Sequence, residues 1–224
     1  MNKTVLALQK PDTLRHQVEK HLREAIMSGS LAPGQRLVER ELCEAMGVSR
    51  PSLREALRKL EAERLIQIIP HRGPVVSAVT EKEAVELYAL RALLEGYAVH
   101  QFTSLATKPL LEELRQAVKS LQRQAKSGNR ENLLRAKQMF YEVLLRGCGN
   151  SLISEVLMML LSRINLLRSA SFSHPSRLPA SLQEIDLLFE RIVAKDPDGA
   201  RDAAINHVRM AEAAAMDVLR ANVI

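Results

Sequence analysis

The chain has 224 residues, of which 46% are hydrophobic and 26% are charged, and its net charge is +6 at neutral pH. This length suits one large domain or two small ones, and the apolar content is sufficient for real hydrophobic cores. Aromatic residues make up only 3% of the chain and tryptophan is absent. This composition argues against a protein that stacks single-stranded bases on aromatic rings.

No apolar run approaches the roughly 18–20 residues of a membrane-spanning helix, and the N-terminus lacks the apolar core of a signal peptide. The two cysteines, Cys43 and Cys148, fall in different predicted domains and suggest no disulfide framework. A buried apolar role is favoured for each of them over redox sensing. We therefore expect a soluble protein of the cytoplasm without a membrane partner.

The positive charge is unevenly distributed along the chain. Residues 1–79 hold 13 Lys and Arg against 9 Asp and Glu, a net charge of +4, whereas residues 80–224 hold 19 against 17, a net charge of +2. An excess of this kind suits a surface that faces DNA phosphates. Ordinary solvated charge would give the same count, so charge alone does not decide the function.

A first helix is predicted to begin after Asp12 or Thr13, either of which can cap it, and to run to about Ser28. Residues 29–34 then form a turn. The apolar residues that we expect to face inward from this helix are Leu14, Val18, Leu22, Ala25 and Ile26.

Residues 37–65 indicate two short helices joined by a tight turn. Gly47 stands where the first helix stops, because glycine tolerates the positive φ of a C-cap. Ser49 is placed to cap the second helix, and Pro51 falls in its first turn, where the missing N–H costs nothing. The apolar positions of this segment are Leu37, Leu42, Met46 and Val48, followed by Leu53, Leu57 and Leu60 at helical spacing.

The second of these helices carries polar residues off its apolar stripe, namely Arg50, Ser52, Arg54 and Arg58. A helix held by its apolar back, with arginines at its N-terminal end, suits insertion into the major groove of DNA. Arginine can make bidentate bonds to a guanine edge or clamp a phosphate, and serine can bond either.

A β-ribbon is predicted next. The runs 66–69 and 75–76 have high β-propensity, and they flank the Pro-His-Arg-Gly-Pro turn of residues 70–74. Arg72 is expected at the tip of the ribbon, and Gly73 is needed for its turn. A helix, a helix-turn-helix and such a wing together make a winged helix-turn-helix.

Three runs of sequence resemble the GntR family of bacterial transcription regulators: GSLAPGQRL (29–37), ERELCEAMGVSRPSLREALRKLEAERLI (39–66) and PHRGPVV (70–76). The remainder is similar in length and helical character to the FadR-type branch, whose C-terminal ligand-sensing domain is called FCD. The resemblance implies a sequence-specific DNA-binding regulator, a homodimeric repressor that reads a palindromic operator under the control of a small effector.

The residues expected to contact DNA are Arg40, Ser49, Arg50, Ser52, Arg54, Arg72 and Gly73. Arg50 and Arg54 should matter most, because their positions at the start of the helix suit base contacts.

A second domain is predicted to begin at Thr80, where Thr80 and Glu83 form a capping box. We expect a winged helix-turn-helix domain over residues 1–79 and an all-α antiparallel bundle over residues 80–224, so the fold is mostly α. A loop is expected over residues 173–179, and the helix of residues 151–171 should be the most buried because it is the most apolar. The predicted helices cover Thr80–Leu105, Lys108–Lys126, Arg130–Arg146, Ser151–Ser171, Ala180–Lys195 and Pro197–Ala221.

FCD domains commonly hold a divalent metal between an Asp and a His four residues apart, a His on a later helix and a His on the last helix. The matching positions in this chain are Lys137, Tyr141, Ile185 and His207, so one ligand of four is retained. Lysine has no acceptor and carries a positive charge that opposes a metal ion. We therefore predict that no metal cofactor is bound.

The resemblance also implies an effector site. Lys137, Tyr141 and His207 would converge on one cavity together with Arg91, which resembles the arginine of an R-x-x-x-E pattern in FCD proteins (here Arg91 and Glu95). Lys137 could hold a small organic acid directly as a point charge, and Tyr141 could donate a hydrogen bond to it. The competing interpretation is that Lys137 is solvated and that Tyr141 and His207 are satisfied core side chains.

Two other classes of function can be weighed from the sequence, an enzyme and a partner-binding protein. An enzyme is not expected, because the chain contains no nucleophile elbow, P-loop, GxGxxG or HExxH motif. The remaining alternative is a helical scaffold or partner-binding protein whose winged helix contacts protein, and a salt-dependent gel shift on promoter DNA would distinguish it from a regulator.

Overall fold

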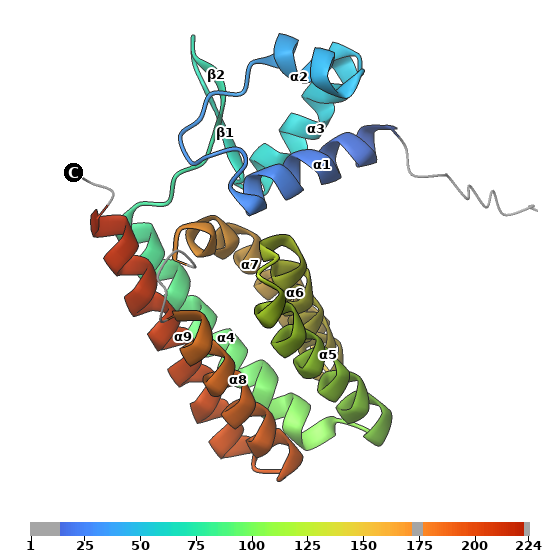
Figure 1. Cartoon of the computed structure of the whole chain (residues 1–224), viewed down its shortest axis with the longest axis vertical. Helices are drawn as coiled ribbons and strands as arrows, with labels where there is room; N and C mark the ends of the chain where they lie inside the picture. Colours follow the sequence, from blue (N-terminus) through green and yellow to red (C-terminus); the bar gives the residue numbers. More distant parts are fainter. Residues whose placement is uncertain (1–13, 172–176, 222–224) are drawn as a thin grey trace, which may run out of the picture. The chain divides into compact units, whose positions relative to one another are not determined.

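The computed structural model describes residues 14–171 and 177–221, apart from the side chains of residues 130, 162 and 165–171. The chain divides into two compact units, Met1–Ala78 and Val79–Ile224, and each is considered by itself. Within the described residues, all regular structure is helical except for one two-stranded sheet (Figure 1). The predicted fold class, a winged helix-turn-helix followed by an all-α bundle, is confirmed.

The first unit contains a small core to which α1, α3 and the wing contribute the buried side chains. The α3 side chains Leu53, Leu57 and Leu60 are fully buried, as their spacing predicted. They face apolar side chains of α1, whose predicted cap, Asp12 or Thr13, lies outside the described residues. The elements of the unit are α1 (Leu14–Ser28), α2 (Glu39–Met46), α3 (Arg50–Ala62), β1 (Ile66–Ile69) and β2 (Gly73–Val76).

Leu14 was predicted to face inward, and this is wrong, because 53% of the residue is exposed. The core of α1 is built from Val18, Leu22 and Ile26, which lie deeper along the same helix. Leu14 begins the helix beyond the end of this core and lies at the edge of a surface groove beside Met46.

The wing is an antiparallel ribbon in which Ile66 pairs with Val76 and Ile69 pairs with Gly73. Its turn depends on two left-handed residues, His71 at φ 63° and Gly73 at φ 84°. Glycine adopts this conformation without the steric cost that a side chain brings. Arg72 lies exposed between them, at the tip where the sequence placed it.

The second unit is a bundle in which α4 lies antiparallel to α9. His100 and Asp198 meet at one end of this pair, and Arg220 and Glu81 meet at the other. The helices of the unit are α4 (Glu81–Leu105), α5 (Lys108–Ser127), α6 (Arg130–Gly147), α7 (Ser151–Ser171), α8 (Arg177–Val193) and α9 (Pro197–Ala221), as Figure 1 shows.

The start of α4 follows its sequence signal closely. The Thr80 hydroxyl accepts a hydrogen bond from the Glu83 N–H at 3.2 Å, and the Glu83 carboxylate accepts one from the Thr80 N–H at 3.1 Å. The predicted capping box is therefore confirmed.

Two details of the bundle differ from the prediction. Helix α8 begins at Arg177, within the segment predicted as a loop, and not at Ala180. Helix α7 is not the most buried helix, because Leu152, Val156 and Met159 are exposed along one side of it. A helix that is apolar on all sides can still present one face to the surface, so mean apolarity alone does not predict burial.

Candidate functional site

The N-terminal end of α3 is fixed by its local sequence. Gly47 closes α2 in the left-handed conformation at φ 63°, and Ser49 begins α3 as its N-cap. The Ser49 hydroxyl lies 3.5 Å from the Ser52 N–H and 3.1 Å from the Ser52 hydroxyl. Both serines are therefore engaged in the cap itself, and the first turn of α3 projects Arg50 and Arg54 outward.

A strongly basic hollow lies between α3 and the wing, with a volume of about 460 Å³. It collects five of the predicted DNA-contacting residues, whereas Ser49 and Ser52 do not line it. We call it the basic hollow; the residues that line it are Arg36, Leu37, Val38, Glu39, Arg40, Arg50, Arg54, His71, Arg72, Gly73 and Pro74.

Two basic residues of the hollow were missed from the sequence, Arg36 and His71. Arg36 belongs to a segment that pairs with β2, since the Val76 N–H donates to the Gln35 carbonyl at 2.9 Å and Arg36 forms an isolated bridge with Val75. The sequence did not indicate this pairing, because residues 35 and 36 are too few to show strand periodicity. His71 lies in the predicted turn of the wing, but its position in the sequence did not indicate that its side chain would line the hollow.

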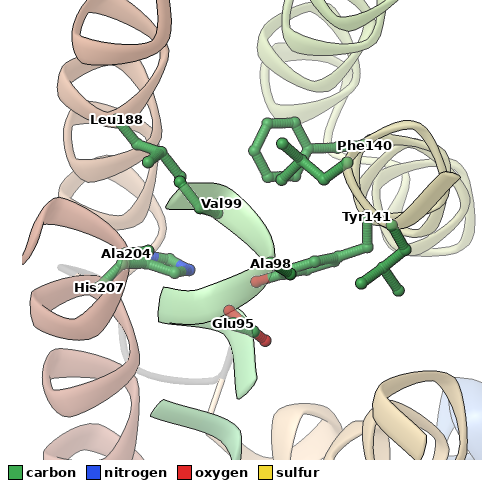
Figure 2. A pocket seen from close by; sticks show the side chains of 10 residues that line it. Glu95, Ala98, Val99, Phe140, Tyr141, Leu188, Ala204 and His207 are labelled. Carbon is green, nitrogen blue, oxygen red and sulfur yellow. The ribbon is translucent and has the colours of Figure 1, made fainter. Parts of the chain in front are cut away.

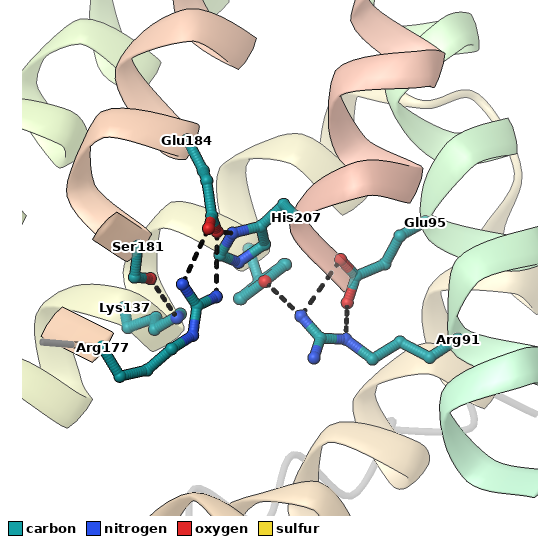
Figure 3. Close-up of polar contacts among 8 residues, drawn as sticks. Arg91, Glu95, Lys137, Arg177, Ser181, Glu184 and His207 are labelled. Atoms are coloured by element: carbon teal, nitrogen blue, oxygen red, sulfur yellow. Dashed lines mark hydrogen bonds and ion pairs between the residues drawn. The ribbon is translucent and has the colours of Figure 1, made fainter. Parts of the chain in front are cut away.

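A buried polar cluster lies inside the bundle, where α4, α6, α8 and α9 meet (Figure 3). Eight side chains contribute to it, and those of the predicted effector residues are all at least nine-tenths buried. We call it the buried cluster; its members are Arg91, Glu95, Lys137, Tyr141, Arg177, Ser181, Glu184 and His207.

Arg91 is fully buried and lies at the centre of one half of the cluster. Its guanidinium donates to both oxygens of Glu95 and, at 2.7 Å, to the Tyr141 hydroxyl. Burial opposes its charge, but Glu95 and the neighbouring tyrosines outweigh this effect, so the pKa of Arg91 is raised and the side chain is a cation. The Nη1 atom of Arg91 has no hydrogen-bond partner among the described residues.

The other half of the cluster is centred on Glu184. Its two oxygens accept hydrogen bonds from the Arg177 guanidinium at 2.8 Å each, and one of them lies 2.6 Å from Nδ1 of His207. Burial raises the pKa of Glu184, but the bonds from His207 and Arg177 lower it by more than burial raises it. The net shift is downward, so the carboxylate is ionised.

His207 is a neutral imidazole in this setting. Burial lowers its pKa most, Lys137 and Arg91 lower it as well, and the bond to Glu184 only partly offsets them, so the pKa falls to about 3. Its contact with Glu184 is therefore a hydrogen bond donated by Nδ1–H and not an ion pair. The acceptor Nε2 is buried and has no partner among the described residues.

A small cavity of about 10 Å³ adjoins the cluster (Figure 2). Glu95, Tyr141 and His207 form its polar edge, and the rest of its lining is apolar, with Phe140 and Leu188 on opposite sides. This volume is near the smallest that can hold one water molecule.

Both units match known family models. Residues 14–76 match the bacterial regulatory proteins of the gntR family, and residues 86–210 match the FCD domain. The FCD match alone spans more than half of the chain. This chain belongs to the GntR family, in its FCD-containing branch.

The GntR assignment is supported by individual relatives. The chain is 27% identical over 201 residues to YdhC of Bacillus subtilis, an uncharacterized HTH-type transcriptional regulator, covering 89% of this chain and 90% of that one. It is 28% identical over 197 residues to a probable D-xylose utilization operon transcriptional repressor of Paenarthrobacter nicotinovorans, covering 88% and 86%. The structure of Escherichia coli McbR/YncC superposes with a TM-score of 0.80 at 24% identity, covering 95% and 99%.

This GntR protein is therefore a DNA-binding transcription regulator with a ligand-sensing domain, which favours the regulator over the partner-binding alternative. Its relatives are regulators and not enzymes. No helix in the described ranges is both long and apolar enough to cross a bilayer.

The structure also places the residues at the family's metal positions. Lys137 and Tyr141 lie in the buried cluster with His207, so Lys137 is not solvated. The predicted convergence on one cavity holds only in part, because Tyr141 and His207 line the small cavity whereas Lys137 and Arg91 do not. Ile185 does not join them, because it packs into the apolar core; the α8 residue that reaches His207 is Glu184, one position earlier.

Three members of the buried cluster were missed from the sequence: Arg177, Ser181 and Glu184. They follow one face of α8 at i, i+4 and i+7, and Leu188 continues that face at i+11. Polar residues that extend an apolar stripe are a usable signal for a buried network. The signal was hidden because the predicted helix began after Arg177.

Acidification tests the protonation state of His207. Because its folded pKa lies below the ordinary value of 6.5, the unfolded chain takes up a proton that the folded chain does not, and stability is lost as pH falls below 6.5. Urea unfolding at pH 6.5 and 5.5 should show a loss of about 1 kcal/mol that is absent in His207→Asn. Equal losses in both proteins would mean that the folded imidazole takes up a proton over this range as the unfolded one does. This window lies above the range in which Glu184 would titrate, since its pKa is lowered.

Proposed function

We propose that this protein is a homodimeric, cytoplasmic repressor that reads a palindromic operator with α3 and the wing, and whose DNA binding is controlled by a small carboxylate. The basic hollow supports operator binding, because the exposed side chains of Arg40, Arg50, Arg54 and Arg72 gather there. Such side chains can bond guanine edges and phosphates. The repressor sign rests on the xylose-operon relative, which is named a repressor.

Substitution of Arg50 tests how the operator is read. Arg50→Ala should weaken binding to an operator duplex by about 1–3 kcal/mol, because a bidentate base contact is lost. Arg58→Ala is the matched control, since Arg58 is exposed on the same helix but does not line the basic hollow. Fluorescence anisotropy at fixed salt measures both affinities. If the two variants bound the operator equally well, α3 would not be the reading helix.

The effector proposal rests on the charges of the buried cluster. Arg91, Lys137 and Arg177 contribute three positive charges, whereas Glu95 and Glu184 contribute two negative charges. Counted over these eight side chains alone, and with His207 neutral, positive charges exceed negative charges by one. A monoanionic carboxylate group would balance it, and buried charges favour such balance strongly.

The same side chains do not suit a divalent metal. Both oxygens of Glu184 already accept from Arg177, and the charge of Lys137 lies close enough to lower the pKa of His207. Among the described residues, no group of three or more His, Cys, Asp or Glu could hold an ion. We therefore propose that the effector is held by side chains alone, without a metal.

The cavity must enlarge to admit an organic acid, since its volume of about 10 Å³ fits no more than a water molecule. The Arg177–Glu184 pair of α8 lies at one side of the cluster, opposite Arg91 and Glu95 (Figure 3). An effector carboxylate that replaces a glutamate as the partner of a guanidinium would shift α8 against α9. Binding would thereby change the packing of the bundle.

Calorimetric titration tests the effector site. A panel of short mono- and dicarboxylates should contain a binder whose affinity falls roughly ten- to a hundred-fold in Lys137→Met, because a hydrogen bond to a charged group contributes about 1.5–3 kcal/mol. Lys119→Met, which removes an exposed lysine of α5, should leave the affinity unchanged. If Lys137→Met bound the same acid as tightly as the wild type, Lys137 would lie outside the site.

The dimer proposal rests on an exposed apolar face. On α4 it contains Leu90, Leu93 and Tyr97, at i, i+3 and i+7; on α7 it contains the exposed residues named above, at i, i+4 and i+7. The two helices pack together through a shared apolar cluster, and we propose that their exposed faces together form the interface. An apolar surface of this kind on a soluble regulator suits a partner subunit.

Introducing a charge into this face tests the dimer. Leu93 is 70% exposed, so Leu93→Lys should leave the fold intact while it disrupts a contact that excludes water. We expect wild type to sediment as a dimer and Leu93→Lys to sediment as a monomer at micromolar concentration. Leu187→Lys, on the exposed side of α8, serves as the control and should remain dimeric. A dimeric Leu93→Lys protein would place the interface elsewhere.

A further inference from the structure

One carboxylate lies among the arginines of the basic hollow. The hollow is lined by five arginines and one histidine, and Glu39 is the only acidic side chain in its described lining. A negative charge here opposes the approach of DNA phosphates, so it weakens binding to any duplex. A residue that lowers overall affinity in this position calls for a compensating role.

The partner of Glu39 is Arg54. The Nε atom of Arg54 lies 3.0 Å from one oxygen of the Glu39 carboxylate and 3.2 Å from the other. The two residues come from different helices, α2 and α3, and the Arg54 side chain is 61% exposed. The guanidinium is thus held at its Nε edge, and its two terminal nitrogens form no other hydrogen bond with the described residues.

The edge that remains open is the one that bonds a base. The terminal nitrogens of an arginine form the fork that contacts O6 and N7 of guanine. A long side chain normally loses rotamer freedom when it makes such a contact, and this loss reduces the affinity gained. Arg50, at the start of the same helix, has no such support among the described residues, so the two arginines are not equivalent.

We infer that Glu39 is a positioning residue for operator reading: it orients Arg54 for a bidentate base contact and, through its charge, disfavours binding to phosphates alone. The orientation of Arg54 raises the ratio of specific to non-specific DNA affinity, whereas the charge of Glu39 lowers both affinities by a similar factor. The inference rests on the proposed placement of α3 in the major groove.

The test compares Glu39→Gln with Glu41→Gln. Both carboxylates lie in the first turn of α2, so both substitutions remove one negative charge near the same helix N-terminus. Glu41 is exposed and does not line the basic hollow. The full-length protein is titrated with a duplex enriched by wild type from a random-sequence pool, and with a shuffled duplex of the same composition.

For Glu39→Gln we expect tighter binding of the shuffled duplex, no gain for the selected duplex, and a specificity ratio lower by about ten-fold. Glu41→Gln should shift both affinities by one factor and keep the ratio of the wild type. An unchanged ratio in Glu39→Gln would overturn the inference.

The Arg54→Ala background separates positioning from a general structural effect. If Glu39 acts through Arg54, then adding Glu39→Gln to Arg54→Ala should leave the specificity ratio where Arg54→Ala alone sets it. A further ten-fold fall in the double variant would show that Glu39 does not act through Arg54. Failure of wild type to enrich any duplex from the pool would instead contradict the proposed operator binding.

Discussion

Among the described side chains of the bundle, three positive ones are buried, and the packing of the four helices around them depends on how these charges are compensated. A guanidinium removed from water costs several kcal/mol unless its partners remain in place. Arg91 therefore requires Glu95 and Tyr141, and Arg177 requires Glu184. Helices α4, α6, α8 and α9 each supply at least one member of the cluster, so their mutual positions are tied to these bonds.

The two units of this regulator differ in the burial and pairing of their charged side chains. In the buried cluster, both guanidiniums are held by carboxylates away from water, so that a new anion can bind only by entering the network or displacing one of its members. In the basic hollow, the arginines are exposed, and most of their side chains form no hydrogen bond with the described residues. Arg54 is the exception, since Glu39 holds one edge of its guanidinium. The first arrangement suits a sensor that responds to a carboxylate, and the second suits a surface that meets a polyanion.

Local signals made much of the fold predictable. The α3 helix, the wing and the capping box at Thr80 each follow from residues within a few positions of one another, namely Gly47, Ser49, Gly73 and Glu83. The antiparallel bundle followed from helix lengths and short turns. Errors arose where the outcome depends on tertiary packing: Leu14 has the right spacing but lies beyond the core, and α7 is apolar on a face that stays exposed.

The candidate sites were predictable to different degrees. Arg40, Arg50, Arg54 and Arg72 were found because the motif places them, whereas Arg36 was missed because its role comes from pairing with β2. In the bundle, the sequence brought Arg91, Lys137, Tyr141 and His207 together but put Ile185 where Glu184 acts. A helix turns by about 100° per residue, so an error of one position moves a side chain from the cluster to the core.

The central claim is that buried cations take the place of a metal in the sensor domain. Elemental analysis of the purified, tag-free protein for divalent metals tests it most directly. We predict a content near zero, which would leave Lys137, Arg91 and Arg177 to hold the effector. About one metal ion per chain, bound through His207, would contradict the account, because Glu184 would then have to release Arg177 to become a ligand.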